Sequence, residues 1–102
     1  MVNIKTVQNY AKSLGMIEFT NDMNELTKSY PNGFRASIVE EFDETTKEYT
    51  GNLSIACFDY NGYAWWNKFP NNDPVICKTE EEAFQIVKQI YEFESIISFS
   101  KQ

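Results

Sequence analysis

The sequence predicts one α+β domain over residues 1-102: an antiparallel β-meander of three to four strands, preceded by one N-terminal helix or two and followed by a C-terminal helix packed on one sheet face. Three observations predict this class. Apolar residues recur at helical spacing near both ends, they alternate with polar residues between Phe34 and Cys77, and Asn61-Gly62 marks a tight hairpin. A chain of 102 residues with four Gly and three Pro has the length and composition of a single folded unit.

The first helix is expected to begin after Asn3, whose side chain is suited to cap the first turn. Ile4, Val7 and Ala11 follow at spacings of three and four, and Gly15 ends the helix.

Residues 16 to 30 leave two interpretations open. Residues 16 to 19 form either a short strand or an extended connector. Asp22 and Glu25 resemble a capping box, and apolar residues at helical spacing favour a short second helix there: Met23, Leu26 and Tyr30.

From Phe34 onward the hydrophobic period is two, which is typical of half-buried strands. The alternating core positions are Phe34, Ala36, Ile38, Leu53, Ile55 and Cys57. Residues 63 to 69 form the return strand after the Asn61-Gly62 turn, and residues 75 to 77 form a short fourth strand.

The last helix opens with the capping box Thr79 to Glu82. Its apolar stripe is wide, so the helix packs on the core. The stripe consists of Ala83, Phe84, Val87, Ile90 and Tyr91.

Two turns set the expected register of the sheet. With Asn61-Gly62 as a two-residue loop, Phe58 pairs with Trp65 and Cys57 pairs with Trp66. If Phe42 pairs with Tyr49, then Ile38 faces Leu53. One face then carries the core positions together with Trp66. The opposite face carries Val39, Ala56, Phe58, Tyr60, Tyr63 and Trp65, with Arg35, Ser37, Asn52, Ser54 and Asn67 around them.

An aromatic second face is unusual for a two-layer domain, where that face meets water. Contiguous exposed aromatic residues mark an interaction surface. The expected contact residues are Phe58, Tyr60, Tyr63 and Trp65. The alternative is that the N-terminal helix and residues 16 to 19 wrap over this face and make a three-layer domain.

Acidic residues gather in the connection between the first two expected core strands. They are Glu40, Glu41, Asp43, Glu44 and Glu48, and they are expected to form an electrostatic rim around the contact. The net charge is −6, which disfavours direct binding of nucleic acid and fits a basic protein partner, such as a nucleic-acid-binding enzyme. The other interpretation is a solvated loop.

The residue types exclude much chemistry. The chain has no histidine, so a Ser-His-Asp triad, a Cys-His dyad and a His-ligated zinc site are excluded. Its four glycines are scattered and form no phosphate loop. Cys57 and Cys77 are expected to be free thiols. No catalytic residue, cofactor or metal is therefore predicted, and no EF-hand pattern supports calcium binding by the residues between Asp59 and Asp73.

The sequence predicts a cytoplasmic, non-enzymatic protein that acts by binding another protein. In type it is similar to small acidic phage or mobile-element proteins that inhibit host enzymes by binding, such as anti-CRISPR and anti-restriction proteins. That likeness implies inhibition of a host nuclease or defence system. The alternatives are a homodimeric interaction module and, with less support, a carboxylate- or lysine-dependent enzyme. No apolar run has the length of a membrane span, so no membrane partner is expected.

Overall fold

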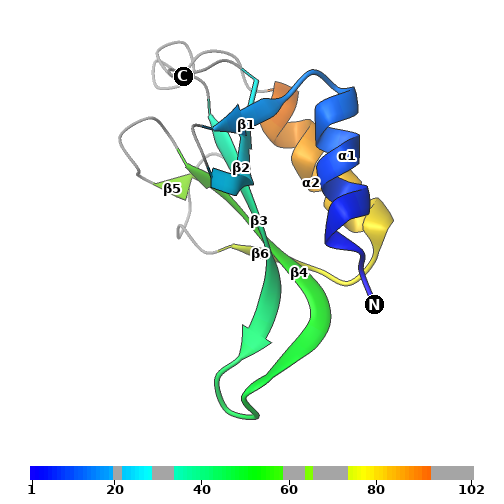
Figure 1. Ribbon diagram of the computed structural model, residues 1–102, viewed down its shortest axis with the longest axis vertical. Coiled ribbons are helices and arrows are strands. Elements are labelled where there is room, and N and C mark those ends of the chain that lie inside the picture. Colours follow the sequence, from blue (N-terminus) through cyan, green and yellow to red (C-terminus); the bar gives the residue numbers. More distant parts are fainter. Residues whose placement is uncertain (20–21, 29–33, 59–63, 66–73, 93–102) are drawn as a thin grey trace.

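A computed structural model describes residues 1–19, 22–28, 34–58, 64–65 and 74–92. These residues form one antiparallel sheet with two helices on the same face (Figure 1). The helices are α1 (Ile4–Ser13) and α2 (Glu80–Glu92). The strands are β1 (Ile17–Phe19), β2 (Asp22–Thr27), β3 (Arg35–Asp43), β4 (Glu48–Phe58), β5 (Ala64–Trp65) and β6 (Val75–Cys77). The predicted α+β meander between an N-terminal and a C-terminal helix is confirmed.

The sheet order is β1-β2-β3-β4-β5, and β6 also pairs with β4. The two partners share one edge of the long strand β4, because β6 lies opposite Leu53–Ile55 and β5 lies opposite Cys57 and Phe58. Strand β4 therefore pairs with three other strands of the sheet.

The expected second helix is wrong, because residues 22–27 form strand β2. Leu26 lies opposite Ala36 of β3, and both side chains are fully buried. On the other face, Glu25 forms an ion pair of 3.0 Å with Arg35. Neighbouring side chains thus point to opposite faces, as in a strand. Hydrogen bonding to β1 and β3 stabilises the strand more than the helical spacing of a few apolar residues could stabilise a short helix.

Both helices begin as predicted. The Asn3 side chain accepts a hydrogen bond of 3.1 Å from the Thr6 amide, and the Thr79 hydroxyl accepts one of 3.1 Å from the Glu82 amide. Gly15, at φ 109°, follows the end of α1 in the left-handed region that favours glycine.

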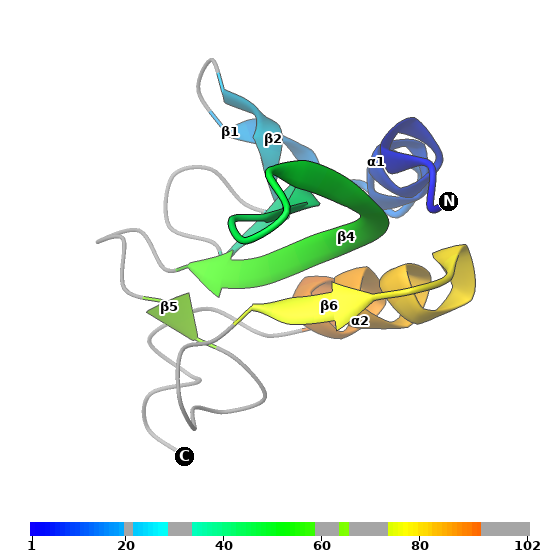
Figure 2. The same ribbon diagram turned by 90° about the horizontal axis from the view of Figure 1, so that it is seen from below.

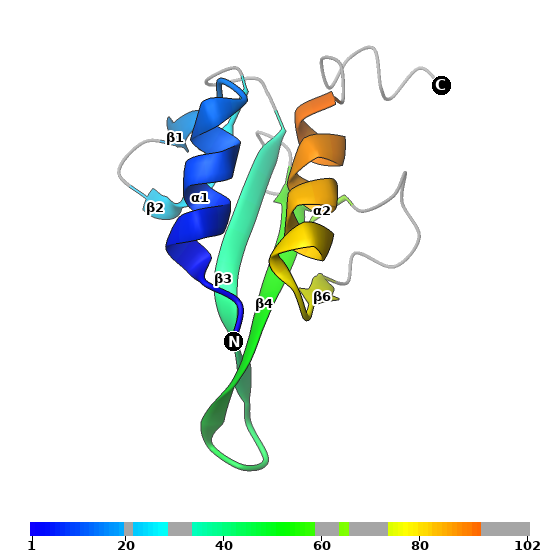
Figure 3. The ribbon, with the colours of Figure 1, turned by 90° about the vertical axis from the view of Figure 1, so that its right-hand side faces the viewer.

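The two helices lie side by side against the sheet (Figures 2 and 3). The rings of Tyr10 and Phe84 stack between them with centroids 4.4 Å apart. Since α1 shares the core face with α2, the alternative in which the N-terminal helix covers the opposite face is wrong.

The core face is confirmed at every predicted position that the structure describes. Phe34, Ala36, Ile38, Leu53, Ile55 and Cys57 are all buried, while Trp66 lies outside the described residues. The helices contribute Val7, Ala11, Ala83, Val87 and Ile90 to the same cluster.

The register of β3 and β4 is confirmed at the turn and shifts beyond it. Phe42 lies opposite Tyr49, but Ile38 lies opposite Ile55 and not opposite Leu53. Between these pairs β4 contains two extra residues, and Gly51 has a φ of 90° there. A shift of two residues keeps every side chain on its predicted face, which explains why the core is right although the pairing is not.

Candidate partner-binding surface

The β3–β4 hairpin projects beyond the helices and the rest of the sheet (Figures 1 and 3). We call residues Glu40–Tyr49 the acidic arm. It contains five carboxylates and one lysine, Lys47. On β3 the ladder with β2 covers only Arg35–Ser37, and on β4 the ladder with β6 covers only Leu53–Ile55. Among the described strands the arm is therefore a two-stranded ribbon.

Two of the five arm carboxylates accept hydrogen bonds from within the β3–β4 hairpin. The Oε1 atom of Glu41 accepts hydrogen bonds from the Thr50 hydroxyl at 2.7 Å and from Nδ2 of Asn52 at 3.2 Å. The Oδ1 atom of Asp43 accepts bonds from the amides of Thr45 and Thr46 at 2.8 and 3.3 Å. These two residues therefore shape the ribbon as well as charge it.

The other three carboxylates lie on the arm surface. Glu44 is 3.5 Å from Lys47 in an exposed pair, which contributes little to stability. Glu40 and Glu48 are exposed and have no ion-pair or hydrogen-bond partner among the described residues. These three side chains are free to meet a partner without loss of the fold.

An exposed aromatic pair lies beside these charges. The rings of Phe42 and Tyr49 pack edge to face with centroids 5.1 Å apart, yet the residues are 41% and 66% exposed. Sequence reasoning missed this pair as a contact. The signal was present, because the two residues were expected to be cross-strand partners beyond the last core position, where no helix covers them.

The opposite sheet face is described only in part. Phe58 is half-buried, and the Arg35 guanidinium lies 5.6 Å from its ring centre. Val39 and Ile76 on this face are 38% and 36% exposed. Tyr60 and Tyr63 lie outside the described residues, so the four-aromatic contact stays a prediction.

The expected pairing of Phe58 with Trp65 is wrong. Phe58 lies opposite Ala64, and Trp65 lies opposite Cys57. Five residues separate Phe58 from Ala64, whereas a two-residue Asn-Gly loop requires an even number between paired positions. Opposite residues share a face, so position 65 belongs to the face of Cys57. Whether Trp65 contacts a partner stays a prediction.

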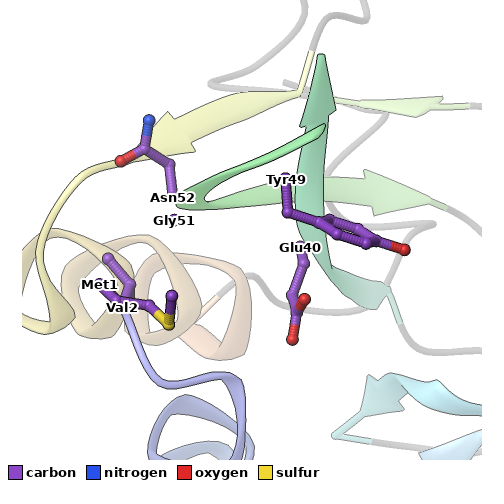
Figure 4. A pocket seen from close by; sticks show the side chains of 6 residues that line it. All are labelled: Met1, Val2, Glu40, Tyr49, Gly51 and Asn52. Carbon is purple, nitrogen blue, oxygen red and sulfur yellow. The ribbon is translucent and has the colours of Figure 1, made fainter. Parts of the chain in front are cut away.

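A small cavity lies where the chain start meets the sheet (Figure 4). The Val2 amide donates a hydrogen bond of 2.8 Å to the Gly51 carbonyl. The cavity between Met1, Val2, Glu40 and Tyr49 has a volume of about 40 Å³. It has room for about one water molecule and none for a substrate.

The cysteines are buried free thiols, as predicted. Burial, together with the Glu82 carboxylate, raises the pKa of the Cys77 thiol to about 11. This thiol therefore stays protonated at neutral pH and is a poor nucleophile. Within the described ranges, no three His, Cys, Asp or Glu side chains gather closely enough to hold a metal ion. No helix in this part of the chain is long and apolar enough to cross a membrane.

The chain matches no protein-family model, and no curated protein or solved structure is significantly similar to it.

Proposed function

We propose that this protein acts by binding another protein through its acidic arm, as a small non-enzymatic inhibitor. The observation that carries the proposal is the composition of the arm, which combines five carboxylates with the exposed pair Phe42 and Tyr49 on a projecting hairpin. A few residues carry most of the binding energy at protein interfaces, and aromatic side chains are enriched at the interface centre, while surrounding charges steer association.

The charge of the arm favours a basic partner. Carboxylates distributed along a ribbon present the same sign of charge as a phosphate backbone, so they compete for the Lys and Arg residues that bind nucleic acid. The net charge of −6 adds long-range attraction to such a surface. The most concrete form of this function is a phage or mobile-element inhibitor of a host nuclease or defence system, of the anti-CRISPR or anti-restriction type.

Quantitative affinity capture from a bacterial lysate tests the proposal. The wild-type protein is compared with a charge variant that carries Glu40→Gln, Glu44→Gln and Glu48→Gln. An aromatic variant carries Phe42→Ser and Tyr49→Ser.

A matched control removes the same number of charges from α2 through Glu80→Gln, Glu81→Gln and Glu92→Gln. The proposal predicts a stoichiometric basic partner that the control retains and that both arm variants recover poorly. Equal recovery by the arm variants and the control would contradict a role for the arm.

A further inference from the structure

The strand β3 has a free edge beside the arm. Its ladder with β2 ends at the pair Glu25 and Ser37, whereas β3 continues to Asp43. On that side, no described strand pairs with residues 38–43. A free strand edge carries a row of hydrogen-bond donors and acceptors that an added strand can use.

The direction of the peptide groups follows from two observed bonds. The Phe34 carbonyl accepts a bond of 2.8 Å from the Thr27 hydroxyl, so position 34 points toward β2. The Asp43 carbonyl accepts from the Lys47 amide at 2.8 Å, within the hairpin, so position 43 points toward β4. Peptide groups alternate in direction along a strand. Even-numbered residues of β3 therefore direct their N–H and C=O groups outward. Ile38 is fully buried, so beyond β2 the accessible outward groups are those of Glu40 and Phe42.

A groove runs along this edge. It has a volume of about 550 Å³ and lies between α1, β2 and the arm. Its lining consists of Ile4, Lys5, Gln8, Asn24, Val39, Glu40 and Tyr49. That volume is in the range of known ligand sites, roughly 300–1,000 Å³. Apolar groups on both sides and outward peptide groups at the edge suit an extended peptide.

We propose that the edge of β3 at Glu40–Phe42 receives an extended, lysine- or arginine-bearing segment of a partner protein as an added strand. Main-chain hydrogen bonds provide affinity in this mode, and alternate side chains provide specificity. One set of side chains lies on the helix-covered face beside Ile4 and Tyr49, and the other set lies on the opposite face beside Val39 and Glu41. This inference rests on the proposed function, because it names how the partner binds.

Charge decides between a basic partner segment and a second copy of this chain. Two β3 edges paired about Glu40 would place Glu40 of each copy close together and align two acidic arms. Like charges opposite each other destabilise a pair of strands. A segment with basic side chains meets the same carboxylates with attraction, and only Lys5 and Lys47 oppose it among the described groove and arm residues.

The first test is a titration of isotope-labelled protein with a blocked peptide of alternating lysine and valine, followed by amide NMR. We predict that resonances of residues 38–42 shift and that exchange of the Glu40 and Phe42 amides slows. A peptide of alternating glutamate and valine should bind at least tenfold more weakly. Unchanged exchange at these amides, or equal binding of the acidic peptide, would overturn the proposal.

A matched pair of variants isolates the backbone contribution. Glu40→Thr and Glu40→Pro both remove the carboxylate, but only the proline removes the outward N–H and blocks the edge. The N–H of Glu40 is not part of the ladder with β4, so the fold should persist, with unchanged Leu53 and Ile55 resonances as its check. Glu40→Thr should retain the peptide-induced shifts, and Glu40→Pro should lose them. Persistence of the peptide-induced shifts in Glu40→Pro would contradict strand addition. If Glu40→Pro does not fold, amide exchange in the wild-type protein with the bound peptide tests strand addition instead.

The outcomes separate this inference from the proposed function. If a captured partner needs the arm charges but binds Glu40→Pro and Glu40→Thr equally, the proposed function stands and strand addition fails. If the peptide binds the edge but the arm variants capture partners normally, the edge of β3 accepts an added strand and the proposed role of the arm fails. A concentration-dependent dimer in light scattering that Glu40→Pro dissociates would identify a second copy as the occupant and contradict the proposal.

Discussion

Replacing Glu41 with alanine should destabilise the protein, although Glu41 belongs to a run of acidic surface residues. Its Oε1 atom accepts two hydrogen bonds, from Thr50 at 2.7 Å and from Asn52 at 3.2 Å. The Thr50 hydroxyl also accepts a bond of 3.1 Å from the Asn52 amide. This network crosses the irregular segment where one residue of β3 faces three of β4.

The magnitude follows from these two bonds. A hydrogen bond to a charged group contributes about 1.5–3 kcal/mol when buried. Here Thr50 is exposed and Asn52 is half-buried, so water replaces part of each bond. We expect Glu41→Ala to lower the free energy of unfolding by about 1–2 kcal/mol in total. For a domain of this size, that loss corresponds to a decrease in Tm of roughly 5–10 °C.

Urea unfolding followed by tryptophan fluorescence measures this loss directly. Glu40→Ala is the matched control, because it removes an exposed carboxylate from the next position, and its effect should stay within about 0.5 kcal/mol. Glu41→Gln keeps an acceptor oxygen and should fall between the two. Equal losses for Glu40→Ala and Glu41→Ala would refute a structural role for the Glu41 network.

Three further predictions concern stability. Lys47 has a φ of 62°, so Lys47→Gly should raise the urea midpoint by the equivalent of about 0.5–1 kcal/mol, and a lower midpoint would refute strain there. Thr79→Ala removes the cap of α2 and should cost about 1 kcal/mol by the same assay, while Thr79→Ser should cost much less. Burial and, as the smaller cause, the Glu82 carboxylate raise the pKa of the Cys77 thiol from 9.0 to about 11. Between these pH values the folded protein keeps a proton that the unfolded chain loses. The stability contributed by the protonated thiol is complete below pH 9.0 and is lost as the pH rises to about 11. Over this range the free energy of unfolding should fall less steeply with pH in Cys77→Ala than in the wild type. Equal slopes for the two proteins would contradict this role of the thiol.

Local signals in the sequence predicted the helices and the core face. The caps at Asn3 and Thr79 act within one turn, so their residue types are sufficient to locate the helix starts. The predicted core face is correct because the register shift at Gly51 is two residues, which keeps Ile38 and Ile55 on the same face of the sheet.

Long-range pairing limited the rest of the prediction. Residues 22–27 form a strand because β1 and β3 flank them, and no local pattern records those neighbours. The position of Trp65 depended on one loop length, and an error of one residue exchanged its face. The acidic residues were predicted as one rim, but hydrogen bonds divide them into two that shape the hairpin and three that lie on its surface, one of them in an exposed ion pair with Lys47.

Under the proposed function, the charges of the acidic arm steer association with a basic protein. The most direct measurement is the association rate constant of a captured partner as a function of ionic strength, for the wild type and the variant with Glu40→Gln, Glu44→Gln and Glu48→Gln. We predict that the wild-type rate falls steeply as salt screens the arm and that the variant associates at least tenfold more slowly at low salt with a flatter dependence. Identical rates and identical salt dependence for the two proteins would contradict the claim.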